Sequence, residues 1–386
     1  MAGRPFAAAL SEHPNAPVGT GEVVGQVLEA LGDPDRPPDL ALVFVTPAFA
    51  GALDEIAATI RATLAPRTLL GCAAVSVLGG TREVERGPGI ALWAGRTGPV
   101  TPFHLTVAQT PDGMTFTGWP EDMPEEPSGL LLIPDPFTFP TDDLLQRLET
   151  DRPGMPVVGG MASAARAPGG NRLVIDDQVV TQGAVGAFLG PGVEVTTVVS
   201  QGCRPVGHPF VVTRAEHNII YELAGRSAIE RLQEVAAGLA DDDRELLADM
   251  VQIGRVIDER KLDFGAGDFL VRQVVGADPN SGALRVGDIV PVGATAQFQV
   301  RDATSADLDL RRMVGGHDAE AALVFTCNGR GTHLFPEPDH DASVVSESLP
   351  GVPVAGMFCA GELGPIGEHN FTHGFTASVV LLSVAP

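Results

Sequence analysis

Ala41-Leu42-Val43-Phe44 recurs unchanged as Ala322-Leu323-Val324-Phe325, and Leu130-Leu131-Leu132-Ile133 is a weaker third copy. Each run is apolar and has the length of a buried strand, and the segment after it can form a helix. In the first copy, Leu53, Ile56 and Ile60 fall on one face of such a helix. The three runs therefore indicate an α/β chain with internal repeats.

The similarity continues after each helix, so the repeated unit is strand, helix, strand, loop and strand. The second strand ends in a glycine and a glycine-rich loop leads to the third strand. Gly71 to Gly89 in the first copy and Gly356 to Gly374 in the third both span 18 residues. The identical tetrapeptide and the equal loop lengths favour duplication over chance. We expect a two-domain α/β protein built from three such repeats, with a divergent α+β insertion.

The insertion lies at about residues 202–315, and the pattern there predicts several short elements. Its predicted strands are 210–214, 219–223, 269–275 and 288–300, and its predicted helices are 228–239, 241–250 and 302–313. The Pro-rich, acidic stretch 111–127 is expected to be a surface connection. The predicted domains are an N-terminal extension (1–37), an N-terminal domain with two copies (38–200) and a C-terminal domain (201–386).

The composition and net charge of the chain argue against several classes of binding partner. The 386 residues are 44% hydrophobic and 19% charged, as in a folded protein, and their net charge is −24. This charge argues against nucleic acid or an anionic membrane as a partner. No apolar run reaches the roughly 18 residues of a membrane span, and the start lacks a signal-peptide pattern. Four scattered cysteines, without a CxxC pair, fit reduced thiols in the cytoplasm.

Several segments resemble the FIST family of sensory domains (F-box and intracellular signal transduction). The C-terminal segments that carry the resemblance are FTCNGRG (325–331), AGMFCAGELGP (355–365) and NFTHGFTA (370–377). QGCRPVG (201–207) and GDFLVR (267–272) in the middle of the chain match as well. The resemblance covers about residues 38–385 and implies a module that senses small molecules such as amino acids. Such modules are often coupled to signalling domains, for which this chain leaves no segment.

The candidate ligand site lies in the C-terminal copy. Asn328, Arg330 and Glu362 follow apolar strands directly, where an open α/β sheet presents its ligand groups. Arg330 could hold a carboxylate and Glu362 an ammonium group, as an amino-acid ligand requires. Asn370 and His373 could add hydrogen bonds, and Arg204 or Arg301 could lend charge. Alternatively, Asn328 to Gly331 is only a turn, and Arg330 and Glu362 pair with each other.

Two enzymatic alternatives stay open. His333, Glu337 and Asp339 to Asp341 crowd one loop, but their spacing matches no helix-borne metal motif. Cys327 with His333 or His373 contains the parts of a thiol catalyst, so the alternative function is a metal- or cysteine-dependent hydrolase. The glycine-rich loops match neither GxGxxG nor a P-loop. We therefore expect a small-molecule-binding sensory protein without cofactor, metal or catalytic residue, and leave a protein signalling partner open.

Overall fold

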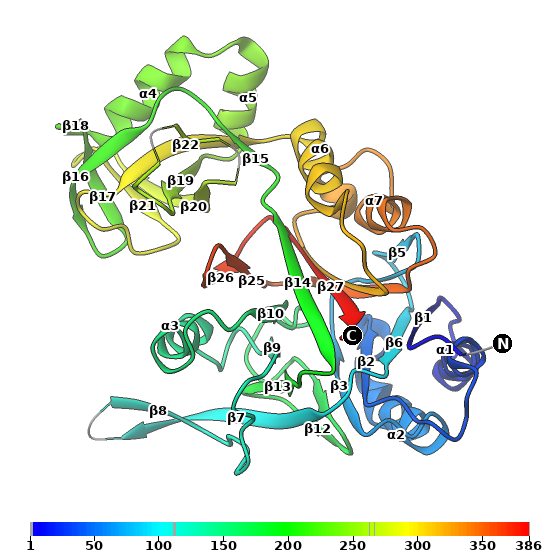
Figure 1. Cartoon of the computed structure of the whole chain (residues 1–386). Coiled ribbons are helices and arrows are strands. Elements are labelled where there is room, and N and C mark those ends of the chain that lie inside the picture. The colour runs from blue at the N-terminus through cyan, green and yellow to red at the C-terminus, as the bar shows by residue number, and fades with distance from the viewer. Residues whose placement is uncertain (1–2, 111–112, 262, 266, 386) are drawn as a thin grey trace. The chain divides into compact units, whose positions relative to one another are not determined.

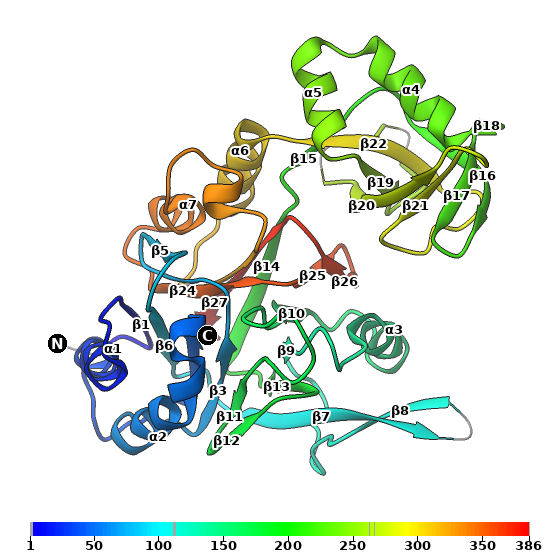
Figure 2. The ribbon, with the colours of Figure 1, turned by 180° about the vertical axis from the view of Figure 1, so that it is seen from behind.

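The computed structural model describes residues 3–110, 113–261, 263–265 and 267–385, which form a mixed α/β structure with several sheets. The chain divides into two compact units (Figures 1 and 2). The first comprises Met1–Val199 and Leu310–Pro386, and the second comprises Ser200–Asp309. The second unit covers most of the predicted insertion. No described helix is long and apolar enough to cross a membrane.

Three sheets build the first unit. The first has the order β1 (Phe6–Ser11), β6 (Ile90–Gly95), β2 (Leu40–Val45), β3 (Thr68–Ala73), β11 (Leu173–Ile175), β12 (Gln178–Val180). The second has the order β8 (Gly113–Thr117), β7 (Val100–Thr110), β13 (Ala184–Leu189), β9 (Gly129–Pro134), β10 (Val157–Gly160), β25 (Glu362–Ile366), β26 (His369–His373). The third has the order β14 (Val193–Ser200), β27 (Ala377–Val384), β23 (Ala321–Cys327), β24 (Val354–Cys359), β4 (Val77–Gly79), β5 (Arg82–Val84).

The three sheets share one arrangement. In each, a central strand (β2, β9 or β23) lies between a parallel neighbour (β3, β10 or β24) and an antiparallel one (β6, β13 or β27). The parallel neighbour then pairs with a hairpin that comes from a different part of the chain. The hairpins therefore bind the three sheets to one another: β4–β5 joins β24 of the third sheet, and β25–β26 joins β10 of the second sheet.

The glycine that ends each predicted second strand has a common physical reason. Gly71, Gly159 and Gly356 each lie beside the carbonyl oxygen of the paired central strand. A Cβ atom at these positions would lie 1.9, 2.0 and 1.9 Å from the carbonyl oxygens of Val43, Leu132 and Val324, respectively. Because no side chain fits there, glycine is required for this close approach of the backbones.

The central strands are buried on both faces, which explains why they are continuous apolar runs rather than alternating ones. One face of each contributes to a common core, in which Phe44, Ile133 and Phe325 meet. The rings of Phe44 and Phe325 pack edge to face with centroids 6.1 Å apart. Helices cover the other faces. They are α1 (Ala16–Leu31), α2 (Leu53–Thr63), α3 (Thr141–Asp151), α6 (Ala303–Val314) and α7 (His340–Ser348).

The second unit contains a closed barrel of six strands. They pair in a ring as β16 (Phe210–Glu216), β17 (Ile219–Leu223), β21 (Ala283–Val286), β20 (Phe269–Asp278), β19 (Gln252–Val256) and β22 (Thr295–Arg301), which returns to β16. The short β15 (Cys203–Pro205) and β18 (Arg226–Ser227) extend it, and α4 (Ala228–Gly238) and α5 (Asp241–Asp249) complete the unit. Its core includes Val212, Ile253 and Phe298.

The structure corrects three predictions. Residues 288–300 are not one strand, because Pro291 cannot donate a ladder hydrogen bond and Gly293 turns the chain with φ 94°. Part of the expected surface connection 111–127 is strand β8; residues 111–112 lie outside the described part. The three glycine-rich loops each contain a hairpin, whose partner strand is too distant in sequence to be inferred from local pattern.

Candidate functional site

The end of β23 and the start of β25 bring three predicted residues near one another in the first unit. After Cys327 the chain turns sharply, because the Arg330 amide donates to the Cys327 carbonyl oxygen (2.9 Å). The predicted turn at Asn328 to Gly331 is therefore present, and the Arg330 side chain points inward and is fully buried. Glu362 is also fully buried. The two charges are close enough that each shifts the pKa of the other.

Arg330 pairs with Asp341, not with Glu362. Its Nε and Nη2 lie 2.7 and 2.8 Å from the two carboxylate oxygens, and both side chains are inaccessible to solvent. The Thr326 hydroxyl (2.5 Å) also donates to Asp341, and His340 Nδ1 lies 2.9 Å from it. Burial disfavours the charged carboxylate, but the guanidinium charge and these hydrogen bonds outweigh it and lower the Asp341 pKa. The pair thus stays ionised at neutral pH.

Glu362 is in the opposite electrostatic situation. Burial raises its pKa to about 8, against the lowering effects of Thr376, the Arg330 charge and the Cys327 thiol. Its Oε2 accepts hydrogen bonds from the amide (3.2 Å) and hydroxyl (2.7 Å) of Thr376. Phe375, the residue before, has a left-handed φ of 63°, a strained conformation of the kind found at functional sites. Glu362 is therefore mostly a neutral acid at pH 7.

Three buried polar atoms of the cluster formed by Asn328, Arg330 and Glu362 have no hydrogen-bond partner among the described residues. They are Nη1 of Arg330, Oε1 of Glu362 and Oδ1 of Asn328. Buried polar groups are nearly always satisfied, by protein, water or a ligand. Nη1 of Arg330 is thus an available donor and Oδ1 of Asn328 an available acceptor, while Oε1 of Glu362 donates when the acid is neutral and accepts when it is ionised.

Glu362 is a carboxylic acid at a sheet position that is apolar in the other two sheets. In each sheet, one hairpin residue pairs with the residue that follows the close-approach glycine. These pairs are Cys72 with Leu173, Met357 with Val77, and Gly160 with Glu362. The first and third sheets thus place an apolar side chain where the second sheet buries a carboxyl group. Since burying an acid is unfavourable where the fold accepts leucine or valine, packing does not explain Glu362.

Sequence reasoning missed the residues that the β4–β5 hairpin contributes. Glu83 accepts the amide of Ala342 (2.9 Å) at the start of α7. Glu85 accepts both the amide (2.9 Å) and the hydroxyl (2.7 Å) of Thr332. No local signal links these acids to a loop about 250 residues later. They fix the loop that carries Arg330, and Gly331 leaves the space that the Glu85 carboxylate occupies.

The side chains of Asn370 and His373 make hydrogen bonds to the backbone of the first unit. The Asn370 side chain accepts the Val157 amide (2.8 Å) and donates to the Met155 carbonyl oxygen (2.8 Å), so it joins β26 to the start of β10. His373 is buried, and its Nε2 donates to the Gly364 carbonyl oxygen (2.9 Å). Both contacts hold the β25–β26 hairpin that carries Glu362, so these residues support the site.

Arg204 and Arg301 belong to the second unit, and Arg204 has partners there. Its guanidinium contacts Asp243 and lies 3.0 Å from Asp302. The hydrogen bond to Asp243 is the main cause of its raised pKa. This ion-pair network lies where β15 adjoins β22, so Arg204 already has acidic partners within its own unit.

The parts of the hydrolase alternative are not assembled as a metal site. Among the described residues, no three His, Cys, Asp or Glu side chains form a group that could hold a metal ion. Cys327 is partly exposed, and its Sγ lies 3.5 Å from the Gly329 amide. His333 is exposed at the surface of its loop. Cys72 and Cys359 are fully buried, which raises their pKa and keeps them as thiols.

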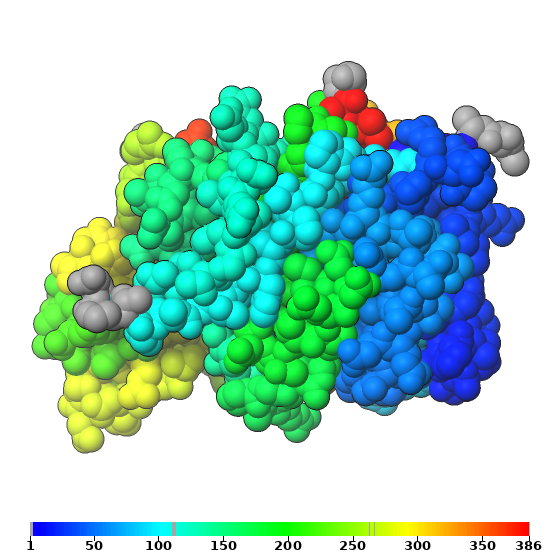
Figure 3. Space-filling view, turned by 90° about the horizontal axis from the view of Figure 1, so that it is seen from below, coloured from blue at the N-terminus to red at the C-terminus, as the bar shows by residue number. Residues whose placement is uncertain are grey.

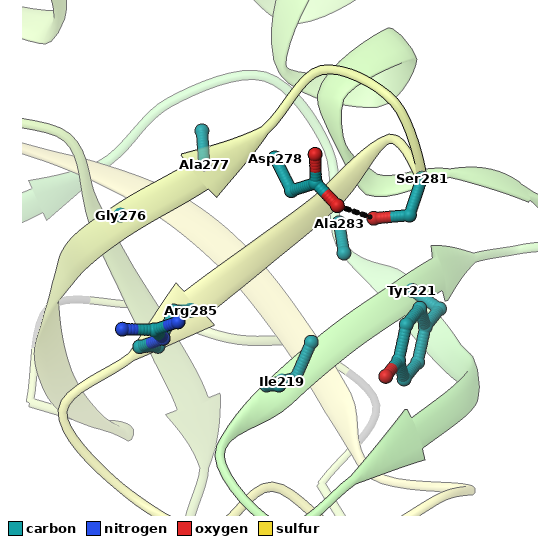
Figure 4. A pocket seen from close by; sticks show the side chains of 8 residues that line it. All are labelled: Ile219, Tyr221, Gly276, Ala277, Asp278, Ser281, Ala283 and Arg285. Atoms are coloured by element: carbon teal, nitrogen blue, oxygen red, sulfur yellow. Dashed lines mark hydrogen bonds between the residues drawn. The ribbon is translucent and has the colours of Figure 1, made fainter.

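A surface pocket of about 390 Å³ lies on β17, β20 and β21 of the second unit (Figure 4). Tyr221 and Arg285 line it. Asp278 also lines it, but its carboxylate accepts the Ser281 hydroxyl (2.6 Å) and so stabilises the turn at the pocket edge. The pocket contains none of the predicted residues.

Two buried acids predict a pH dependence. The pKa of Glu83 is also raised to about 8, by burial and then by the Asp341 charge. Between about pH 5 and 8 the folded state holds protons that the unfolded state has released, so the free energy of unfolding falls as pH rises. Each carboxyl contributes up to about 1.4 kcal/mol per pH unit. We expect urea unfolding of Glu362→Gln to show a shallower decline than wild type, whereas equal slopes would contradict the assignment.

Comparison with known proteins finds matching domain models and relatives that are similar over most of their length. The family model of the FIST N domain matches residues 39–226, and that of the FIST C domain matches residues 228–365. The uncharacterized protein Rv0628c of Mycobacterium tuberculosis strain H37Rv is 45% identical over 350 residues, 89% of this chain and 91% of the relative. The uncharacterized protein Mb0898c of Mycobacterium bovis is 42% identical over 374 residues, 95% of this chain and 96% of the relative.

Proposed function

The chain belongs to the FIST family, whose domains are associated with sensing and signal transduction, and we propose that it senses a small polar metabolite. The binding site is the buried cluster around Arg330 and Glu362, and an amino acid is the first candidate ligand. The protein would act in the cytoplasm and pass its signal to a protein partner.

The observation that carries this proposal is the position of Glu362. A neutral acid is buried where the other two sheets have Leu173 and Val77, and its Oε1 has no partner among the described residues. A buried acid of this kind lowers the stability of the fold unless a bound ligand forms a hydrogen bond or an ion pair with it. Functional sites are where proteins retain groups that packing alone would exclude.

The free atoms match the two ends of an amino acid. Nη1 of Arg330 can donate to a carboxylate, while the rest of the guanidinium stays on Asp341. Once Glu362 has released its proton, its Oε1 can accept from an ammonium group, and Oδ1 of Asn328 can accept a second hydrogen bond. Cys327, Asn328 and Gly329 are partly exposed, so this turn is the route by which a ligand would enter.

A threefold repeat of one unit is consistent with a binding role for Glu362. We infer that the three sheets derive from one strand–helix–strand–hairpin–strand unit, present three times. In two copies the hairpin residue at this position is apolar and packs in the core, and in the third copy the residue at this position is Glu362. The common strand order and the three close-approach glycines support this inference.

Thermal unfolding across a panel of amino acids, nucleotides and divalent metals tests the function. A ligand at about 100 times its Kd adds roughly 2.7 kcal/mol, which raises the midpoint by about a few degrees. We expect an amino acid to shift wild type, and not Glu362→Gln, which keeps the shape of the site. A shift with a divalent metal alone would favour the hydrolase alternative, and equal amino-acid shifts in both proteins would refute this site.

A further inference from the structure

A second pocket, of about 320 Å³, lies in the first unit between α3, β8 and the connection after β8. Figure 3 shows this face, with the cyan surface of β7 and β8 beside the blue-green surface of α3. The volume is in the range of small-molecule sites. None of its lining residues belongs to the Arg330 cluster.

Aromatic rings form one wall. Trp119 stacks on Phe188 with centroids 6.0 Å apart and planes 28° apart, and Phe103 packs against both at 5.3 and 5.4 Å. Trp119 is only partly buried, whereas Trp93 is completely buried. Met123 is 45% exposed at the edge of the pocket. The wall is thus aromatic and apolar, and Trp119 and Met123 are its partly exposed members.

An arginine without a carboxylate partner faces this wall. The guanidinium carbon of Arg152 lies 5.4 Å from the Phe188 ring centroid. Its Nη1 donates to the carbonyl oxygens of Pro124 (2.8 Å) and Glu125 (3.3 Å), which fix it, and no ion pair to it exists among the described residues. Arg147, the other arginine at the pocket, pairs with Asp151. The charge of Arg152 is therefore held at the pocket without a counterion.

We propose that this pocket binds a small aromatic anion, whose ring stacks on Trp119 and whose carboxylate is held by Arg152. The surrounding chain carries a net charge of −24, so an anion needs such a local positive charge to bind. Guanidinium and indole groups bind a flat anion by hydrogen bonding and stacking together. The site is independent of the proposed amino-acid site.

Titration calorimetry with 1-naphthoate, and with the neutral 1-naphthamide as matched probe, tests the proposal. Wild type should bind naphthoate saturably and at least about tenfold more tightly than naphthamide, the effect of one charge-assisted contact. Arg152→Gln should abolish this preference, and Trp119→Ala should weaken both probes. Arg86→Gln, which removes an exposed arginine that does not line the pocket, and Glu362→Gln should bind as wild type does.

Arg152→Gln also removes the hydrogen bonds from Arg152 to Pro124 and Glu125, so its effect is not specific to the lost charge. A variant that fills the pocket and keeps Arg152 therefore provides a second test. Thr115→Phe places a ring in the pocket from β8, leaves Arg152 in place and should block naphthoate. The indole N–H resonance of Trp119, and not that of Trp93, should move on binding. Absence of saturable binding, or wild-type affinity in Trp119→Ala, Arg152→Gln or Thr115→Phe, would overturn the proposal.

Discussion

Arg330→Met is expected to lower the free energy of unfolding of the first unit by about 3–5 kcal/mol, because it leaves Asp341 charged and buried without its partner. Both side chains are inaccessible to solvent and joined by two hydrogen bonds of 2.7 and 2.8 Å. Urea unfolding followed by tryptophan fluorescence measures this loss. Trp93 and Trp119 both lie in the first unit, so the signal reports on it alone.

The matched control is an exposed ion pair. Arg311 and Glu347 lie 2.9 Å apart, but their side chains are 45% and 61% exposed. Arg311→Met should therefore change stability by at most about 1 kcal/mol. The double variant Arg330→Met/Asp341→Asn should recover part of the loss, since it removes the unpaired charge. Losses of equal size in Arg330→Met and Arg311→Met would contradict a special role for the buried pair.

Gly356→Ala is expected to prevent stable folding of the first unit. The added Cβ would lie 1.9 Å from the Val324 carbonyl oxygen, so β24 would have to separate from β23 in the middle of the third sheet. Backbone clashes of this kind fall in the rare class of substitutions that cost more than about 4 kcal/mol. Soluble yield and circular dichroism measure the outcome.

Gly21→Ala is the control for that substitution. Gly21 lies in α1, and nothing lies within 4 Å of a Cβ atom there. Alanine should stabilise the helix by about 0.5–1 kcal/mol. If Gly356→Ala folded as stably as Gly21→Ala, the close-approach explanation of the repeated glycines would be wrong.

The sequence was most informative about the strands that are buried on both faces. The runs at Leu40–Val45 and Gly129–Pro134 are apolar throughout, and Ala321–Cys327 is apolar except for Thr326, so such runs can be identified without a structure. The pairing of the hairpins could not be predicted, because β4 pairs with a strand that lies 280 residues later, β24 (Val77 with Met357). Local patterns carry no information about a partner so distant in sequence.

The sequence points to Arg330 and Glu362 through their positions after strands and through the family resemblance. The structure places both in one buried cluster, and their role in binding stays a prediction. The pairing of Arg330 with Asp341 cannot be read from the sequence, where Asp341 belongs to a loop rich in possible metal ligands. Backbone groups of Met155 and Val157 satisfy the Asn370 side chain, and no local pattern indicates these distant partners.

Proton release on ligand binding tests the central claim most directly. The Glu362 pKa of about 8 means that the carboxyl is mostly protonated at pH 7, and an ammonium group bound beside it would ionise it. Calorimetry at pH 7 in two buffers of different ionisation enthalpy counts these protons, with the amino acid that raises the unfolding midpoint most. We expect nearly one proton to be released per ligand bound to wild type and none with Glu362→Gln. Binding without proton release, or equal release from both proteins, would contradict the assignment of Glu362 as the group that holds the ligand.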